Sequence, residues 1–167
     1  MNDIITDHLP TDRGAGKSRH PGPWDGEPDK IQWTDDTTGL PCLIVRNRMG
    51  ALCGYVGVAP DHPWHGKDYS GTYSEADEYV EGPDSKVDVH GGLTYAAKCH
   101  GDICHVTEEH DERWWFGFDC SHSFDLIPYM LDEGYPSALP ESATYKDIAY
   151  VRAECARLAA QLVVVTP

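Results

Sequence analysis

The sequence contains no apolar segment long enough to cross a membrane or to act as a signal peptide. The N-terminal MNDIITDHLPTDRGAGKSRH holds no such stretch, and no later apolar run approaches the roughly 20 residues that span a bilayer. We therefore expect a cytoplasmic protein without membrane contact. Because thiols stay reduced in that compartment, the six cysteines, at positions 42, 53, 99, 104, 120 and 155, are expected to form no disulfide.

Basic residues are also scarce. Thirteen Lys and Arg stand against 28 Asp and Glu, which gives a formal net charge of −15. A field of that sign repels phosphate backbones and anionic membranes, so we expect no direct binding of nucleic acid. The charge suits a partner with a basic surface, such as a host protein that grips nucleic acid, although solubility alone also explains it. The oligomeric state is left open.

The familiar signatures of nucleotide-binding and hydrolytic sites are absent, since no P-loop, GxGxxG, HExxH or GxSxG string occurs. What is present is the length and composition of one globular domain. With 167 residues, 40% of them apolar, the chain is long enough to bury roughly two thirds of its unfolded surface. Any chemistry must therefore come from less specific groups placed on an ordinary core.

The chain divides into a polar N-terminal arm, residues 1–30, and a single α+β domain, residues 31–167. The arm is rich in Gly, Pro and Asp, with Trp24 as its large apolar anchor, and is either flexible or laid across the domain surface. From Ile31 the segments IQW, CLIV and ALCGYVGV alternate with turn residues, which is typical of a meander of short strands. KVDVH and GLTYAA predict a further strand pair that reverses at Gly91 and Gly92.

Two segments define the predicted core. In ERWWFGFDC, Trp114, Phe116 and Phe118 alternate with residues on the opposite face, as in a strand. Between residues 145 and 162, apolar residues recur at helical spacing, at positions 148, 151, 155, 158 and 162. We therefore predict a loop-rich α+β fold in which an antiparallel β-sheet is packed by a C-terminal amphipathic helix.

The main candidate site combines the ends of two predicted strands. FDCSHSFD places Asp119, His122 and Asp125 at a turn, and VHGG places His90 before two glycines. These four residues are the predicted catalytic set, because imidazole and carboxylate serve as general acid and base. Asp119, His122 and Asp125 are the predicted ligands of a divalent metal, which would lower the pKa of a bound water.

The same site offers contacts for a ligand. Backbone amides at Gly91 and Gly92 can approach an anion closely, and Trp115 shares its strand face with Asp119, where it could stack on a base or sugar ring. A phosphorylated or nucleotide-like small molecule is the predicted ligand class. The simpler interpretation is structural: an aspartate that caps the turn, a half-buried histidine and a hairpin at HGG.

A second candidate is a structural zinc site in CHGDICH, with Cys99, Cys104 and His105 as ligands. Thiolate and imidazole are zinc ligands, but a tetrahedral site needs four of them. No second cysteine pair stands at a matching interval. The alternative is a turn at Gly101 and Asp102 whose thiols pack as small apolar groups.

Several segments together resemble a family of small uncharacterised proteins of bacteriophages, prophages and bacterial chromosomes. They are GPWDGEPDKIQW, PCLIVRNRMGALCGYVGV, VHGGLTY and WWFGFDCSHSFD, and the likeness covers roughly Gly22 to Leu162. The resemblance implies a phage or mobile-element setting, with the host cytoplasm as location, and supplies no activity and no catalytic residue.

Two functions follow from these observations. The first is a metal-binding or small-molecule-binding domain with a His/Asp pocket, which as an enzyme would be a metal-assisted hydrolase. The second is a non-enzymatic phage or prophage accessory protein with an anti-defence role, which inhibits a host factor through its acidic surface or by sequestering a ligand.

Overall fold

The structure, a computed structural model, describes residues 3–7, 18–105, 112–133 and 140–166. Its main sheet has the strand order β1-β2-β3-β4-β8-β7, and every neighbouring pair is antiparallel. The strands are β1 (Ile4–Thr6), β2 (Lys30–Thr34), β3 (Pro41–Arg46), β4 (Leu52–Val58), β7 (Tyr95–Lys98) and β8 (Trp114–Asp119). A separate hairpin consists of β5 (Thr72–Tyr73) and β6 (Tyr79–Val80). The helices are η2 (Pro23–Gly26), η3 (Pro83–Lys86), α1 (Pro128–Asp132) and α2 (Ile148–Leu162).

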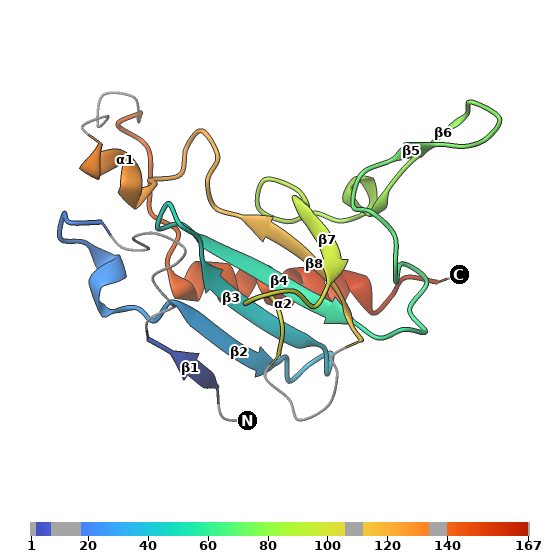
Figure 1. Ribbon diagram of the computed structural model, residues 1–167, viewed down its shortest axis with the longest axis horizontal. Helices are drawn as coiled ribbons and strands as arrows, with labels where there is room; N and C mark the ends of the chain where they lie inside the picture. The colour runs from blue at the N-terminus through green and yellow to red at the C-terminus, as the bar shows by residue number, and fades with distance from the viewer. Residues whose placement is uncertain (1–2, 8–17, 106–111, 134–139, 167) are drawn as a thin grey trace.

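Helix α2 lies across one face of the main sheet (Figure 1), which confirms the predicted α+β class. The helix begins after Asp147, whose Oδ1 accepts a hydrogen bond from the Tyr150 amide at 2.9 Å, as an N-cap residue does. Its buried stripe, Val151, Cys155, Leu158, Ala159 and Leu162, follows the predicted periodicity. Gly54 of β4 lets the helix approach, because a Cβ there would lie 2.7 Å from the Cys155 sulfur.

The opposite face of the sheet is covered as well, so β3 and β4 are buried along their whole length. A buried apolar cluster on this face consists of Leu43, Val45, Cys53, Tyr55 and Trp115. None of the Trp115 surface is exposed (0%). Tyr95, Cys99 and Ile103 pack over the cluster. The alternation predicted for β8 is therefore present, but the Trp115 indole has no exposed face on which a ligand could stack.

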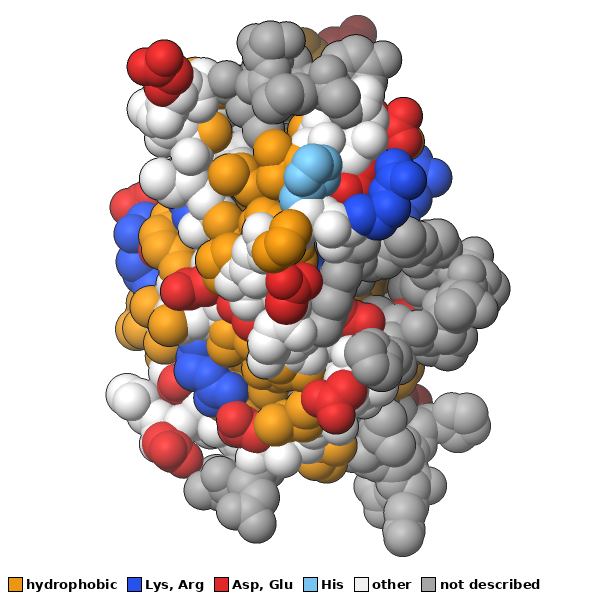
Figure 2. Space-filling model, turned by 90° about the vertical axis from the view of Figure 1, so that its left-hand side faces the viewer, with side chains coloured by type: hydrophobic (Ala, Val, Ile, Leu, Met, Phe, Trp, Pro, Cys, Tyr) orange, Lys and Arg blue, Asp and Glu red, His pale blue; other side chains and the backbone are white. Residues whose placement is uncertain are grey.

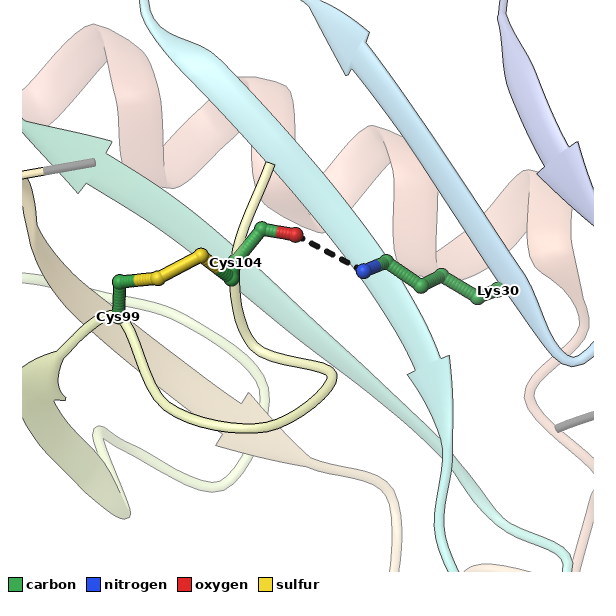
Figure 3. The surroundings of a disulfide bond; sticks show 3 residues. All are labelled: Lys30, Cys99 and Cys104. Atoms are coloured by element: carbon green, nitrogen blue, oxygen red, sulfur yellow. Dashed lines mark hydrogen bonds between the residues drawn. A yellow bond between two sulfur atoms is a disulfide. The ribbon is translucent and has the colours of Figure 1, made fainter. Parts of the chain in front are cut away.

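The expectation that no disulfide forms is wrong, because Cys99 and Cys104 are joined. The chain reverses at Gly101, which has a φ of +58°, and this turn brings the two Cα atoms to 4.7 Å. Lys30 Nζ donates to the carbonyl oxygen of Cys104 at 2.8 Å (Figure 3). The expectation of free thiols considered only the reducing cytoplasm and not the proximity that this turn creates.

The disulfide also removes the predicted structural zinc site. Both sulfurs are oxidised, so Cys99 and Cys104 offer no thiolate to a metal. His105 Nε2 instead lies 3.0 Å from the carbonyl oxygen of Cys42. The other four cysteines, Cys42, Cys53, Cys120 and Cys155, are buried free thiols.

KVDVH is not a strand, although the reversal at the diglycine is present. Gly91 and Gly92 both have positive φ, +67° and +84°. The amides before them are satisfied by side chains of α2 and not by a neighbouring strand: Asp88 N–H donates to Gln161 Oε1, and His90 N–H donates to Glu154 Oε2, both at 2.7 Å. This segment is therefore fastened to the helix, which positions His90.

A buried arginine ties the described part of the N-terminal arm to the domain. The Arg46 side chain is 0% exposed. Its Nε donates to Asp29 Oδ1 at 3.0 Å, its Nη2 to Glu27 Oε2 at 3.1 Å, and its Nη1 to the Tyr145 hydroxyl at 2.7 Å. Trp24 is buried and its ring meets the ring of Tyr145 edge-on. Residues 24–29 thus lie on the domain and contribute to its hydrogen bonding.

The surface carries two further features. The hairpin β5–β6 projects away from the main sheet (Figure 1) and exposes Tyr73, Tyr79 and Val80. On the face shown in Figure 2, acidic side chains are scattered among hydrophobic and uncharged ones. Among the described residues, no helix combines the length and the apolar character needed to cross a bilayer.

Candidate functional site

Three of the four predicted site residues converge in the structure. His90, from the turn before β7, meets His122 and Asp125, from the turn after β8. One ligand atom from each residue can be chosen so that all three atoms lie within 4.8 Å of one another. Two segments more than 30 residues apart in the chain therefore bring two imidazoles and a carboxylate to one place, which we call the His/His/Asp cluster.

Asp125 is the hub of this cluster and is 2% exposed. Its Oδ2 accepts from His90 Nε2 at 2.8 Å and from the His122 amide at 2.9 Å, and Lys146 Nζ lies 3.5 Å from its Oδ1. Burial opposes the charged form, but the hydrogen bonds from His90 and His122, with the positive charge nearby, outweigh it and lower the pKa of Asp125. The carboxylate is therefore ionised at neutral pH.

His90 is held on both ring nitrogens. Nε2 faces Asp125, and Nδ1 lies 2.9 Å from the Tyr150 hydroxyl. Since an ionised carboxylate can only accept, Nε2 carries a hydrogen, and in the neutral imidazole Nδ1 then accepts from Tyr150. Burial, followed by the charge of Glu154, raises the pKa of Tyr150, so its hydroxyl keeps the hydrogen that this bond needs.

His122 has a nitrogen without a partner. Its Nδ1 is buried and makes no hydrogen bond, although it lies 3.5 Å from Asp125 Oδ2. The remainder of the imidazole reaches the surface, with 37% of the side chain exposed. A buried unpaired nitrogen is unfavourable, and an ion bound in the cluster would satisfy it.

Gly91 makes room for His122. A Cβ at Gly91 would lie 2.1 Å from His122 Cε1, and one at Gly92 would lie 2.8 Å from Asp84 Oδ1. Asp84 in turn accepts a hydrogen bond from the Leu93 amide at 2.6 Å. The two glycines were predicted to present amides to a ligand, but the Gly92 amide donates to the Val89 carbonyl oxygen at 3.0 Å. Their Cβ positions show that they admit neighbouring side chains.

Asp119 lies outside the His/His/Asp cluster. Its Oδ2 accepts from the Thr94 hydroxyl at 2.9 Å and its Oδ1 accepts from the Ser121 amide at 3.0 Å. The Ser121 bond closes the turn that follows β8, which agrees with the simpler interpretation of this residue, and the Thr94 bond links it to the segment before β7. His90 replaces Asp119 as the third candidate ligand.

Helix α2 contributes residues that the sequence analysis did not single out. Tyr150 and Glu154 are four positions apart on α2, a spacing that places side chains on one face of a helix, and Lys146 lies just before the N-cap residue Asp147. Lys146 contacts Asp125, while Tyr150 and Glu154 bond to His90. The helical periodicity that predicted the buried stripe also places Tyr150 and Glu154 on one face. Their role could not be predicted, because the sequence does not show that this face packs against VHGG.

Two of the separations between candidate ligand atoms are close to those around a tetrahedral divalent ion. Ligand distances of about 2.0–2.1 Å place neighbouring ligand atoms roughly 3.3 Å apart. His122 Nδ1 and Asp125 Oδ2, at 3.5 Å, nearly match this separation. His90 Nε2 and Asp125 Oδ2, at 2.8 Å, would open by about half an ångström when an ion replaces the shared hydrogen.

A pocket of about 420 Å³ lies elsewhere, beside the C-terminal end of α2. Its lining includes Trp64, Lys67, Lys86 and Val164, and it includes no residue of the His/His/Asp cluster. The pocket and the cluster are therefore separate features.

No family model, no curated protein and no solved structure matches the chain. The resemblance to phage and prophage proteins therefore stays a prediction.

The ionised Asp125 carboxylate should make the free energy of unfolding depend on pH in the acid range. The pKa of Asp125 is lowered from 3.8 on folding, so its contribution is fully present above that pH and is lost as the pH falls through the folded value. We expect Asp125→Asn to be less stable than the wild type by roughly 1–3 kcal/mol near neutral pH. Urea unfolding at a series of pH values should show the two proteins converging below pH 3.8; a constant difference would contradict this role.

Proposed function

We propose that the chain binds a divalent transition metal through His90, His122 and Asp125, and that this centre activates water for hydrolysis. The observation that carries the proposal is the approach of one ligand atom from each of the three residues within 4.8 Å, together with the unpaired His122 Nδ1. Three protein ligands leave a coordination position open, and a water bound there has its pKa lowered towards about 7.

The surroundings of the cluster support the same proposal. Ligating histidines in metal sites usually bond through their second nitrogen to a fixed partner, and ligating carboxylates are themselves hydrogen-bonded. His90 has such a partner in Tyr150, and Asp125 has the His122 amide and Lys146. The charge balance also fits, because the one carboxylate is ionised and both imidazoles can bind in their neutral form.

Isothermal titration of zinc into chelator-treated protein tests the metal site. We expect one zinc ion per chain, and we expect His122→Ala and His90→Ala each to weaken the affinity at least about 100-fold, since removal of a direct ligand should exceed the 10–100-fold effect of losing an outer partner. Cobalt substitution gives a second readout, because a tetrahedral site with nitrogen and oxygen ligands has a visible absorption spectrum.

The matched control is His20→Ala, which removes an exposed imidazole outside the cluster and should leave zinc affinity unchanged. Circular dichroism establishes that each variant is folded before its titration is interpreted. Absence of zinc binding by the folded wild type, or equal loss in all three variants, would refute the proposed site.

The second predicted function, inhibition of a host factor by an accessory protein, stays a prediction. Its premises were the net charge and the resemblance to phage and prophage proteins. On the face shown in Figure 2, the acidic side chains are dispersed and not gathered into one docking patch. The metal centre is therefore the function that we argue.

A further inference from the structure

Two side chains beside the His/His/Asp cluster are not among its candidate ligands. They are Tyr150, in the first turn of α2, and Lys146, just before the N-cap of that helix. Lys146 Nζ is 3.5 Å from Asp125 Oδ1 and 5.4 Å from the centroid of the Tyr150 ring. The Tyr150 hydroxyl is 2.9 Å from His90 Nδ1. Tyr150 is 38% exposed and the Lys146 side chain is 16% exposed, so both can be reached from solvent.

Metal binding would change what these two groups do. A metal on His90 Nε2 requires that nitrogen to lose its hydrogen, and the neutral imidazole then carries its hydrogen on Nδ1. Nδ1 would donate to the Tyr150 oxygen, and the Tyr150 hydrogen would be free to point elsewhere. Asp125 would share its charge with the ion, which weakens its hold on Lys146. The result is a free hydroxyl donor and, beside Asp125, an ammonium group that keeps its hydrogen bond to Thr144 Oγ1 and has further hydrogens to donate.

We propose that Lys146 and Tyr150 form an oxyanion-binding pair for the substrate of this centre, and that the substrate is a phosphate monoester. This inference rests on the proposed metal function. A phosphate monoester has three terminal oxygens, one each for the ion, the ammonium and the phenol hydroxyl, whereas a carboxylate has only two. Two further carboxylates lie beside the pair: Asp147 Oδ1 accepts from the Tyr150 amide at 2.9 Å, and Glu154 Oε1 is 3.3 Å from Arg157 Nη1, which partly offsets its charge.

The reaction that these positions serve is hydrolysis of the ester. The oxygen of water attacks phosphorus, and the bond between phosphorus and the ester oxygen breaks. One hydrogen of the water ends on the alcohol that leaves, and the other stays with the inorganic phosphate. Lys146 and Tyr150 hold terminal oxygens throughout and transfer no proton, so they stabilise the charge that develops on the phosphoryl group.

Titration of inorganic phosphate into protein loaded with one equivalent of zinc tests the pair. We expect Lys146→Met to weaken phosphate binding at least tenfold, and Tyr150→Phe to weaken it about 2- to 10-fold, as expected for loss of one hydrogen bond. Lys98→Met and Tyr73→Phe, which change exposed residues away from the cluster, are the matched controls and should bind phosphate as the wild type does. Hydrolysis of p-nitrophenyl phosphate should decline in the same order.

Each outcome decides between the two proposals. Zinc binding with phosphate affinity unaffected by Lys146→Met would overturn the oxyanion pair and leave the metal centre standing. Acetate bound as tightly as phosphate would overturn the assignment to phosphate monoesters. If zinc does not bind, phosphate is titrated into the metal-free protein: affinity that Lys146→Met reduces supports the pair without the metal, and absence of binding overturns both.

Discussion

Replacement of Arg46 by methionine should lower the free energy of unfolding by about 3–5 kcal/mol, the range for breaking a buried ion pair by removing one partner. The guanidinium is fully buried and meets both Asp29 and Glu27. Methionine fills a similar volume but leaves two carboxylates at a poorly solvated position without their cation. The change should be measured by urea denaturation at neutral pH, followed by tryptophan fluorescence.

Arg48→Met is the matched control for this substitution. Arg48 occupies the turn after β3 and is exposed, so its replacement should alter stability by less than about 0.5 kcal/mol. Adding Glu27→Gln to Arg46→Met should recover part of the loss, because it removes one of the uncompensated charges. A loss below about 1 kcal/mol for Arg46→Met would show that Glu27 and Asp29 find water instead.

The Arg46 network also shows where sequence patterns stop being informative. The meander of β2, β3 and β4 was predictable, because apolar strands separated by turn residues form it locally. The network needs three segments, around Glu27, Arg46 and Tyr145, to meet in space, and no local pattern encodes their meeting. The same limit applies to Cys99 and Cys104, which the turn at Gly101 brings together.

The His/His/Asp cluster was partly predictable for a related reason. His90 and His122 stand at the ends of segments that read as strands, and polar residues at such places are candidates for a site. The sequence could not choose between Asp119 and Asp125, because Asp119 ends β8 and Asp125 follows it by six residues. The geometry of the turn distinguishes the two residues. Asp119 accepts a hydrogen bond from the Ser121 amide, whereas Asp125 accepts hydrogen bonds from His90 and from the His122 amide. Lys146 and Tyr150 could not be predicted as neighbours of the cluster, because their contacts depend on how α2 packs against VHGG.

Gly91→Ala should disable the cluster without touching any of its three ligands. The backbone at Gly91 has a φ of +67°, a conformation that costs an L-residue roughly 1–2 kcal/mol. In addition, the new Cβ would lie 2.1 Å from His122 Cε1, so the imidazole must move. Because misplacing a ligand side chain weakens a metal site, we expect zinc affinity to fall at least about tenfold, as measured by isothermal titration.

Gly39→Ala separates the two effects. Gly39 also has positive φ, +72°, but a Cβ there would meet nothing within 4 Å. The two variants should therefore lose similar stability from backbone strain, roughly 1–2 kcal/mol each, while only Gly91→Ala loses zinc affinity. If both variants bind zinc as the wild type does, His122 does not need its present position to hold the ion. That result would remove the unpaired Nδ1 as the support of the metal site, and the ion would then have to be held by ligands that do not depend on the position of His122.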